Sequence, residues 1–198
     1  GWSEFIVHTG QHFDAEMSSI FFEQMGLREP GVNLKIHSLG HGAMTGRMLE
    51  QLELYMKQEK PHMVLVYGDT NSTLAGALAA RKLHIPVAHI EAGLRSFNEA
   101  MPEEINRVLT DRISHILFCP SEGAIKNLEN EGYQSLGVKR KVVQVGDVML
   151  DAALKFANQP NAAQKVNEMK PSEEFILCTL HRQENTDCPE KLTNLVKA

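Results

Sequence analysis

The sequence has few cysteines and no concentration of positive charge. Its 198 residues include three cysteines, an odd number without a Cys-x-x-Cys spacing, so neither a disulfide framework nor a zinc site is indicated. Twenty Lys and Arg stand against 25 Asp and Glu, which gives a net charge of −5, and they form no long basic run. The chain therefore lacks the electrostatic footprint of a nucleic-acid-binding protein.

Long apolar runs and several common catalytic signatures are also missing. No apolar stretch approaches the roughly 20 residues of a membrane-spanning helix, so no membrane span is expected. Nucleotide-binding glycine loops, the nucleophile elbow of serine hydrolases and the His-Glu-x-x-His zinc motif are absent from the sequence. Because Cys119 and Cys178 lie within apolar runs, we expect buried, reduced thiols and a cytoplasmic location.

The chain does contain a regular alternation of short apolar strands and amphipathic helices. Strands are expected at residues 4–8, 62–67, 86–90, 116–119, 142–145 and 175–179, and helices at 15–25, 43–58, 70–82, 102–115, 122–131 and 148–157. This alternation is typical of an α/β protein with a doubly wound parallel sheet. The polar stretch 159–172 predicts a linker between a Rossmann-like domain, residues 1–158, and the incomplete beginning of a second, residues 173–198.

Acidic residues follow two neighbouring strands of this predicted sheet. Asp69 comes directly after strand 62–67, and Glu91 directly after strand 86–90. A strand–helix–strand unit is right-handed and returns the chain parallel to itself, so both carboxylates lie at one sheet edge, the edge where open α/β sheets bind ligands. Acid–base chemistry or cation binding is predicted there. Two structural alternatives remain: Asp69 as a helix cap, and Glu91 in an ion pair with Arg95.

Other polar residues near this edge are candidates for binding. Thr70 begins helix 70–82, whose hydroxyls and free N–H groups could hold a phosphate. Glu103 and Arg107 are spaced i, i+4 on one helix face, which is equally typical of a solvated ion pair. His181 and Arg182 follow strand 175–179 closely, at the edge where acid–base or phosphate contacts are expected.

Four segments together resemble the non-hydrolysing UDP-N-acetylglucosamine 2-epimerases, a family that includes UDP-2,3-diacetamido-2,3-dideoxyglucuronate 2-epimerases. The segments are residues 67–75, 89–95, 102–107 and 145–151. The resemblance implies a GT-B fold, with the active site between two Rossmann-like domains. It implies inversion at C2 of a UDP-2-acetamido sugar by elimination and re-addition of UDP, without a metal or nicotinamide cofactor. A bacterial-type role in surface polysaccharide precursor synthesis and a homodimer of the full-length protein are also implied.

The resemblance also assigns roles by position, leaving open which acid removes and which returns the C2 proton. Asp69, Glu91 and Glu103 match the essential acids and His181 the essential histidine, while Arg107, Arg182, Thr70 and Arg95 are expected to contact the substrate. Gln11, His12 and Arg47 resemble parts of an activating nucleotide-sugar site. The neighbouring Phe13 and Asp14 depart from the more polar pattern of that site.

The sequence differs from the family in extent as well. It lacks an upstream loop that carries an active-site arginine and most of the second domain, so we expect a fragment truncated at both ends and inactive alone. Conversion of UDP-N-acetylglucosamine to UDP-N-acetylmannosamine is the favoured reaction. Epimerisation of UDP-2,3-diacetamido-2,3-dideoxyglucuronate is the alternative, because residues 10–14 and 181–187 resemble that subgroup. A GT-B glycosyltransferase or a non-catalytic sugar-nucleotide binder remains as a different class.

Overall fold

The computed structural model describes residues 1–12, 19–133, 140–160, 162–169, 174–176, 178–180 and 183–197. The chain divides into two compact units, Gly1–Leu150 and Asp151–Ala198. Asp14 and the first residues of the predicted helix 15–25 lie outside the described residues.

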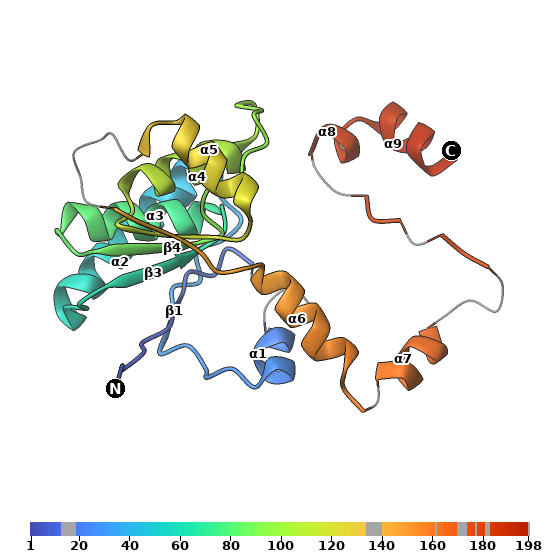
Figure 1. Ribbon diagram of the computed structural model, residues 1–198, viewed down its shortest axis with the longest axis horizontal. Helices are drawn as coiled ribbons and strands as arrows, with labels where there is room; N and C mark the ends of the chain where they lie inside the picture. The colour runs from blue at the N-terminus through green and yellow to red at the C-terminus, as the bar shows by residue number, and fades with distance from the viewer. Residues whose placement is uncertain are drawn as a thin grey trace. The chain divides into compact units, whose positions relative to one another are not determined.

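A four-stranded parallel sheet forms the centre of the first unit. Its strands are β3 (Val64–Tyr67), β4 (Val87–Ile90), β5 (Ile116–Cys119) and β6 (Lys141–Gln144), hydrogen-bonded in that order. They are connected by the helices α3 (Asn71–Lys82), α4 (Pro102–Ile113) and α5 (Glu122–Asn130). Each helix connects a strand to its next neighbour in the same direction across the sheet. Because such crossovers are right-handed, all three helices lie on one face of the sheet (Figure 1). The carboxyl ends of all four strands meet at one edge, as the sequence predicted.

The N-terminal part of this unit forms a separate small sheet. Strand β1 (Val7–His8) pairs in parallel with β2 (Val32–Asn33), and α1 (Ser19–Met25) lies between them in the chain. The predicted strand 4–8 is therefore reduced to two paired residues. Its partner is β2, and the described residues show no hydrogen-bonded pairing between β1 and the four-stranded sheet.

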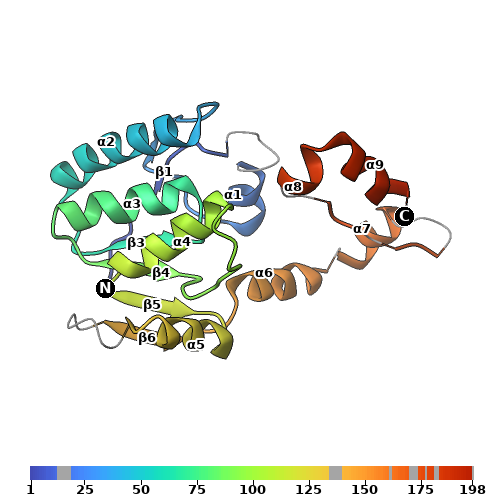
Figure 2. The same cartoon turned by 90° about the horizontal axis from the view of Figure 1, so that it is seen from above.

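Helix α2 (His41–Glu59) covers α3 and completes the main core (Figure 2). It contributes Met48, Leu52 and Met56, which are four residues apart and share one buried face. Helix α3 is rich in buried small residues, which let α2 and the sheet approach closely. At Gly76 an added Cβ would lie 3.2 Å from Cγ1 of Val66. This packing holds the beginning of α3, and with it the turn after β3, in a fixed position.

The second unit holds helices without a sheet among the described residues. They are α6 (Val148–Ala157), which begins in the first unit, then α7 (Ala162–Met169), α8 (Gln183–Thr186) and α9 (Pro189–Lys197). The predicted helix 148–157 is confirmed, whereas α7 lies within the predicted linker 159–172. The described residues of the predicted strand 175–179 form no strand, and Ile176 is 94% exposed. An isolated strand has no partner for its backbone groups, which explains the difference. Cys178, expected to be buried, is exposed as well, whereas Cys119 is buried as expected. The predicted domain bounds stay predictions.

None of the helices in the described part of the chain has the length and apolar character needed to cross a membrane.

Candidate active site

The turn after β3 presents Asp69 without using its carboxylate as a helix cap. The N-cap of α3 is Thr70, whose hydroxyl accepts a hydrogen bond from the Thr73 N–H at 3.4 Å. In return, the Thr73 hydroxyl accepts from the Thr70 N–H at 3.2 Å, which completes a capping box. The alternative in which Asp69 caps the helix is therefore wrong. Its carboxylate is left for other contacts.

Asp69 forms an ion pair with Arg107 of α4, between Oδ2 and Nη2. Asn106, which precedes Arg107 in α4, donates from Nδ2 to the Asp69 carbonyl at 2.9 Å. Both contacts span the gap between the turn after β3 and the first turns of α4. Two segments far apart in sequence therefore hold the Asp69 backbone and its carboxylate in one orientation.

Arg107 pairs with Glu104 and not with the predicted partner Glu103. Its Nη1 lies 3.2 Å from Oε2 of Glu104, at a spacing of i, i+3. Glu103 is exposed, and no hydrogen bond or ion pair of its side chain is found in the described structure. Because Glu104 lies on the buried face of α4, it is the glutamate that the arginine meets. The predicted catalytic role of Glu103 stays a prediction.

Glu104 organises the loop that follows Glu91. It is 4% exposed and accepts hydrogen bonds from the Ser96 N–H at 2.9 Å, the Ser96 hydroxyl at 2.8 Å and the Phe97 N–H at 3.2 Å. Burial alone would raise the pKa of this carboxyl, but the bonds from Ser96 and Phe97 and the charge of Arg107 lower it overall. The sequence analysis missed Glu104. Its position three residues before Arg107, on the same face of a helix, could have indicated this ion pair.

Replacing Glu104 by Gln is expected to lower the free energy of unfolding at neutral pH by about 2 kcal/mol, since buried donors lose a charged acceptor. The folded-state pKa is depressed below 4.5, so this contribution is present above the unfolded pKa and disappears as pH falls through the folded one. Denaturant unfolding at neutral and acidic pH measures it. The matched variant Glu103→Gln should change stability by less than about 0.5 kcal/mol. Equal losses in the two variants would contradict the assignment.

Glu91 lies beside Asp69 in an unusual backbone conformation. Its φ is +70°, a left-handed value that is uncommon for a residue with a side chain. An added Cβ at Gly68 would lie 3.4 Å from Oε2 of Glu91, so the carboxylate reaches the turn that carries Asp69. Burial raises the pKa of Glu91, the charges of Asp69 and Asp147 raise it further, and His89 and Arg107 oppose the rise. The structure thus brings Asp69, Glu91 and Arg107 together.

Arg95 turns away from Glu91, so the alternative pairing of these two residues is wrong. Its guanidinium forms a bidentate pair with Glu131, at 2.6 and 2.9 Å, and lies 2.7 Å from Oδ2 of Asp111. The side chain is 2% exposed. This geometry does not support the predicted substrate contact, because the carboxylates of Glu131 and Asp111 already occupy the guanidinium.

A buried histidine and aspartate lie next to the turn that carries Asp69. His89 and Asp111 have fully buried side chains, with Nδ1 of His89 2.7 Å from Oδ1 of Asp111. The other ring nitrogen, Nε2, lies 2.7 Å from the Gly68 carbonyl. Asp111 also accepts from the Gly93 N–H at 3.0 Å. The sequence analysis missed this pair, although a histidine within the otherwise apolar strand 87–90 was a signal.

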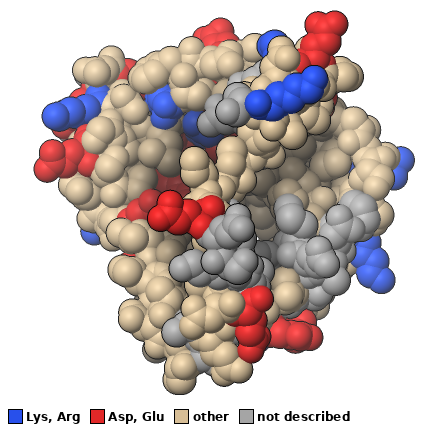
Figure 3. All heavy atoms as spheres, turned by 90° about the vertical axis from the view of Figure 1, so that its right-hand side faces the viewer, with Lys and Arg blue, Asp and Glu red and all other residues tan. Residues whose placement is uncertain are grey.

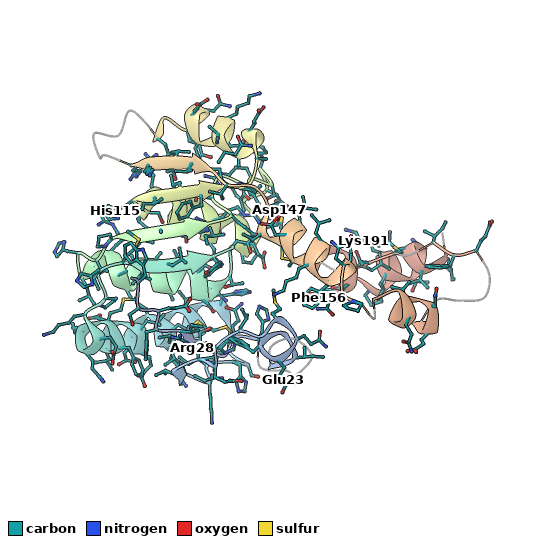
Figure 4. The ribbon with its side chains drawn as sticks, turned by 60° about the horizontal axis from the view of Figure 1, so that its bottom comes forward. Glu23, Arg28, His115, Asp147, Phe156 and Lys191 are labelled. Atoms are coloured by element: carbon teal, nitrogen blue, oxygen red, sulfur yellow. The ribbon has the colours of Figure 1, made fainter. Side chains whose placement is uncertain are left out.

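Asp147 belongs to the same edge of the sheet. It follows β6, and Figure 4 shows it at the opposite end of the sheet from His115. Its Oδ1 accepts from the Met149 N–H at 2.8 Å and the Leu150 N–H at 3.4 Å, which caps α6. Its charge also contributes to the raised pKa of Glu91. Asp147 follows its strand as Asp69 does, and that position could have identified it.

The predicted activator residues come from two segments of the described structure: Gln11 and His12 follow β1, and Arg47 lies on α2. Gln11 accepts from the N–H and hydroxyl of Ser72, at 3.2 and 3.1 Å, within the first turn of α3. It thereby occupies a backbone donor that an anion would use. Arg47 is exposed on α2 and lines a surface pocket with Lys35 and Glu50. Within the described residues no hydrogen bond or ion pair joins Arg47 to Gln11 or His12. The activating site stays a prediction.

His181 and Arg182 lie outside the described residues, and their roles stay predictions. Among the residues that the structure does describe, no three His, Cys, Asp or Glu side chains are grouped so that they could hold a metal ion.

The fold and the site define an α/β domain of the GT-B type, with acids and an arginine at the carboxyl edge of its parallel sheet. The sequence model of the UDP-N-acetylglucosamine 2-epimerases matches residues 2–198. The chain belongs to this family.

Individual relatives agree with this membership. The UDP-2,3-diacetamido-2,3-dideoxy-D-glucuronate 2-epimerase of Pseudomonas aeruginosa is 62% identical over 196 residues, 99% of this chain and 54% of that protein. A Methanococcus maripaludis UDP-N-acetylglucosamine 2-epimerase is 48% identical, over 97% of this chain and 52% of that protein. The crystal structure of Methanocaldococcus jannaschii UDP-GlcNAc 2-epimerase in complex with UDP-GlcNAc and UDP superposes with a TM-score of 0.87 at 47% identity, covering 98% of this chain and 53% of that one. The chain spans about half the length of these relatives.

Proposed function

We propose that the protein containing this chain epimerises C2 of a UDP-2-acetamido sugar, with UDP-N-acetylglucosamine and UDP-N-acetylmannosamine as the two partners of the reaction. The observation that carries the proposal is the juxtaposition of the Asp69–Arg107 ion pair with Glu91 across the Gly68 turn. Two carboxylates in different electrostatic environments at one edge suit the removal and return of a proton.

The environments of the two acids suggest separate tasks. The ion pair with Arg107 holds the Asp69 carboxylate in place, and we assign Asp69 as the base that takes the C2 proton. Glu91 has a raised pKa because of burial and two neighbouring carboxylates, which favours the protonated form and thus a donor to C2. As the C2–H bond breaks, the C1–O bond to UDP breaks and leaves a 2-acetamidoglucal. Re-addition of UDP at C1 and of a proton on the other face of C2 completes the inversion.

A second candidate substrate is UDP-2,3-diacetamido-2,3-dideoxyglucuronate, which reacts at the same carbon. The specific observation in its favour is the 62% identity to the Pseudomonas aeruginosa epimerase, against 48% for the Methanococcus maripaludis UDP-N-acetylglucosamine 2-epimerase. Both substrates require the same acids at C2, so the choice between the two substrates depends on the residues of the sugar pocket.

The decisive experiment incubates the full-length protein with each UDP-sugar in D2O and follows C2 by NMR. We expect deuterium at C2 and transient release of UDP with one of the two sugars. A glycosyltransferase or a sugar-nucleotide binder would incorporate no deuterium, and that result would overturn the proposal. The 198-residue chain alone should give no measurable rate, because it lacks about half of the length of its relatives. Turnover by the chain alone would contradict this expectation.

The wider setting is part of the same proposal. We infer a role in polysaccharide precursor synthesis, a homodimer of the full-length protein and a cytoplasmic location, which the three free cysteines support. Binding to nucleic acid is not proposed. Figure 3 shows Lys and Arg scattered near the rim of one face, and the described residues visible there form no basic patch.

A further inference from the structure

Within the described structure, the hydrogen bonds of the His89 ring join it to none of Asp69, Glu91 and Arg107, yet the ring contacts the backbone of the turn that carries Asp69. Its ring is fully buried at the third position of β4. Nε2 lies 2.7 Å from the carbonyl oxygen of Gly68, the residue before Asp69. Nδ1 lies 2.7 Å from Oδ1 of Asp111 on α4. Two residues further along the chain from His89 is Glu91. The imidazole therefore connects the turn that carries Asp69 to the strand that ends at Glu91.

The hydrogen-bond partners of His89 determine which ring nitrogen must donate. The Gly68 carbonyl can only accept, so Nε2 donates to it. Nδ1 lies beside Asp111, which also accepts from the Gly93 N–H at 3.0 Å and from Arg95 at 2.7 Å. The ring is therefore held between the turn that leads to Asp69 and helix α4.

We propose that His89 is a positioning residue of the epimerase site, whose ring donates from Nε2 to the Gly68 carbonyl and fixes the Gly68–Asp69 turn against the end of β4. The mechanistic part of this inference rests on the proposed function, whereas the ordering of the turn does not. Gly68 has a φ of +63°, and its N–H donates to the Ile90 carbonyl at 3.1 Å. Its carbonyl is held by His89, so the ring secures the peptide group that leads into Asp69. Loss of the ring would free the base carboxylate to move relative to Glu91.

The first test requires no variant. In the full-length protein with 15N-labelled histidine, we expect Nε2 of His89 to carry the proton that it donates to the Gly68 carbonyl. A bare Nε2 would overturn the proposed contact.

The second test compares two identical substitutions at opposite ends of the sheet. His89→Phe removes both hydrogen bonds, and we expect kcat to fall about 100-fold, the size typical of a small misplacement of a reacting group, with KM changed by less than about threefold. His115→Phe is the matched control. That ring accepts from the Val87 N–H at 3.1 Å at the amino end of β5 (Figure 4), and its loss should leave kcat within about twofold.

Amide hydrogen exchange separates this inference from the proposed function. The Gly68 N–H should exchange at least about tenfold faster in His89→Phe than in wild type, and at the wild-type rate in His115→Phe. This result would support positioning even if the protein showed no C2 exchange, in which case the proposed function alone would fail. A folded His89→Phe protein with wild-type kcat or with unchanged Gly68 exchange would overturn the inference. If His89→Phe does not fold, His89→Gln, which keeps one donor for the Gly68 carbonyl, should show a loss in kcat of about tenfold, and an unchanged kcat would again overturn it.

Discussion

Replacing Asp69 by Asn should lower the rate of C2 proton exchange by about 10³-fold, the contribution typical of a well-placed general base. Asn keeps the shape of the side chain but cannot accept the proton. The fold should be retained, because α3 is capped by Thr70 and not by Asp69. The measurement is deuterium incorporation at C2 in D2O, together with the thermal midpoint of unfolding.

Glu129→Gln is a suitable control for this experiment. It makes the same change from carboxylate to amide on the exposed surface of α5, and we expect both the exchange rate and the thermal midpoint to stay at wild-type values. An Asp69→Asn protein that exchanges the C2 proton as fast as Glu129→Gln would remove Asp69 from the mechanism.

Replacing Asp111 by Asn should cost about 3–5 kcal/mol in the free energy of unfolding, as expected when one partner of a buried ion pair is removed. The carboxylate is fully buried and accepts from His89, Gly93 and Arg95. An amide at this position cannot neutralise the charge of Arg95. Denaturant unfolding of the wild type and of Asp111→Asn measures the difference in free energy of unfolding. An unchanged dependence of that free energy on denaturant concentration checks that both proteins unfold in two states.

Glu131→Gln provides the comparison for Asp111. Glu131 also pairs with Arg95, but its side chain is 31% exposed, so water can replace part of the lost interaction. We expect a smaller loss, about 1 kcal/mol. If the two variants lost equal stability, the burial of Asp111 would not be the reason for its importance.

The main sheet could be predicted because its signals are local. Apolar runs of four residues, a capped small-residue helix and a proline at the first turn of α4 each specify one element, and the bounds of α3 and α4 fall within two residues of those predicted. The prediction of a strand at 175–179 was wrong for a related reason. Its apolar pattern is local, but a strand exists only where a neighbouring strand supplies hydrogen bonds.

The candidate site was predictable in part. The chain order of strand, helix and strand was enough to place Asp69 and Glu91 at one edge, because the handedness of the crossover leaves a single arrangement. The choice between the neighbours Glu103 and Glu104 was not predictable in this way. It depends on which carboxylate faces Ser96, Phe97 and Arg107 after α4 packs on the sheet.

The amino-acid sequence alone was sufficient for the order of the elements, the edge that carries the acids and the resemblance to the epimerase family, since these follow from periodicity, handedness and residue identity. Only the folded chain decided the partners of the charged groups. Arg95 turned to Asp111 and Glu131, Arg107 to Asp69 and Glu104, and His89 to Gly68. The reason is physical: a buried charge must be compensated by whatever group the tertiary packing brings within reach, and sequence spacing does not contain that distance.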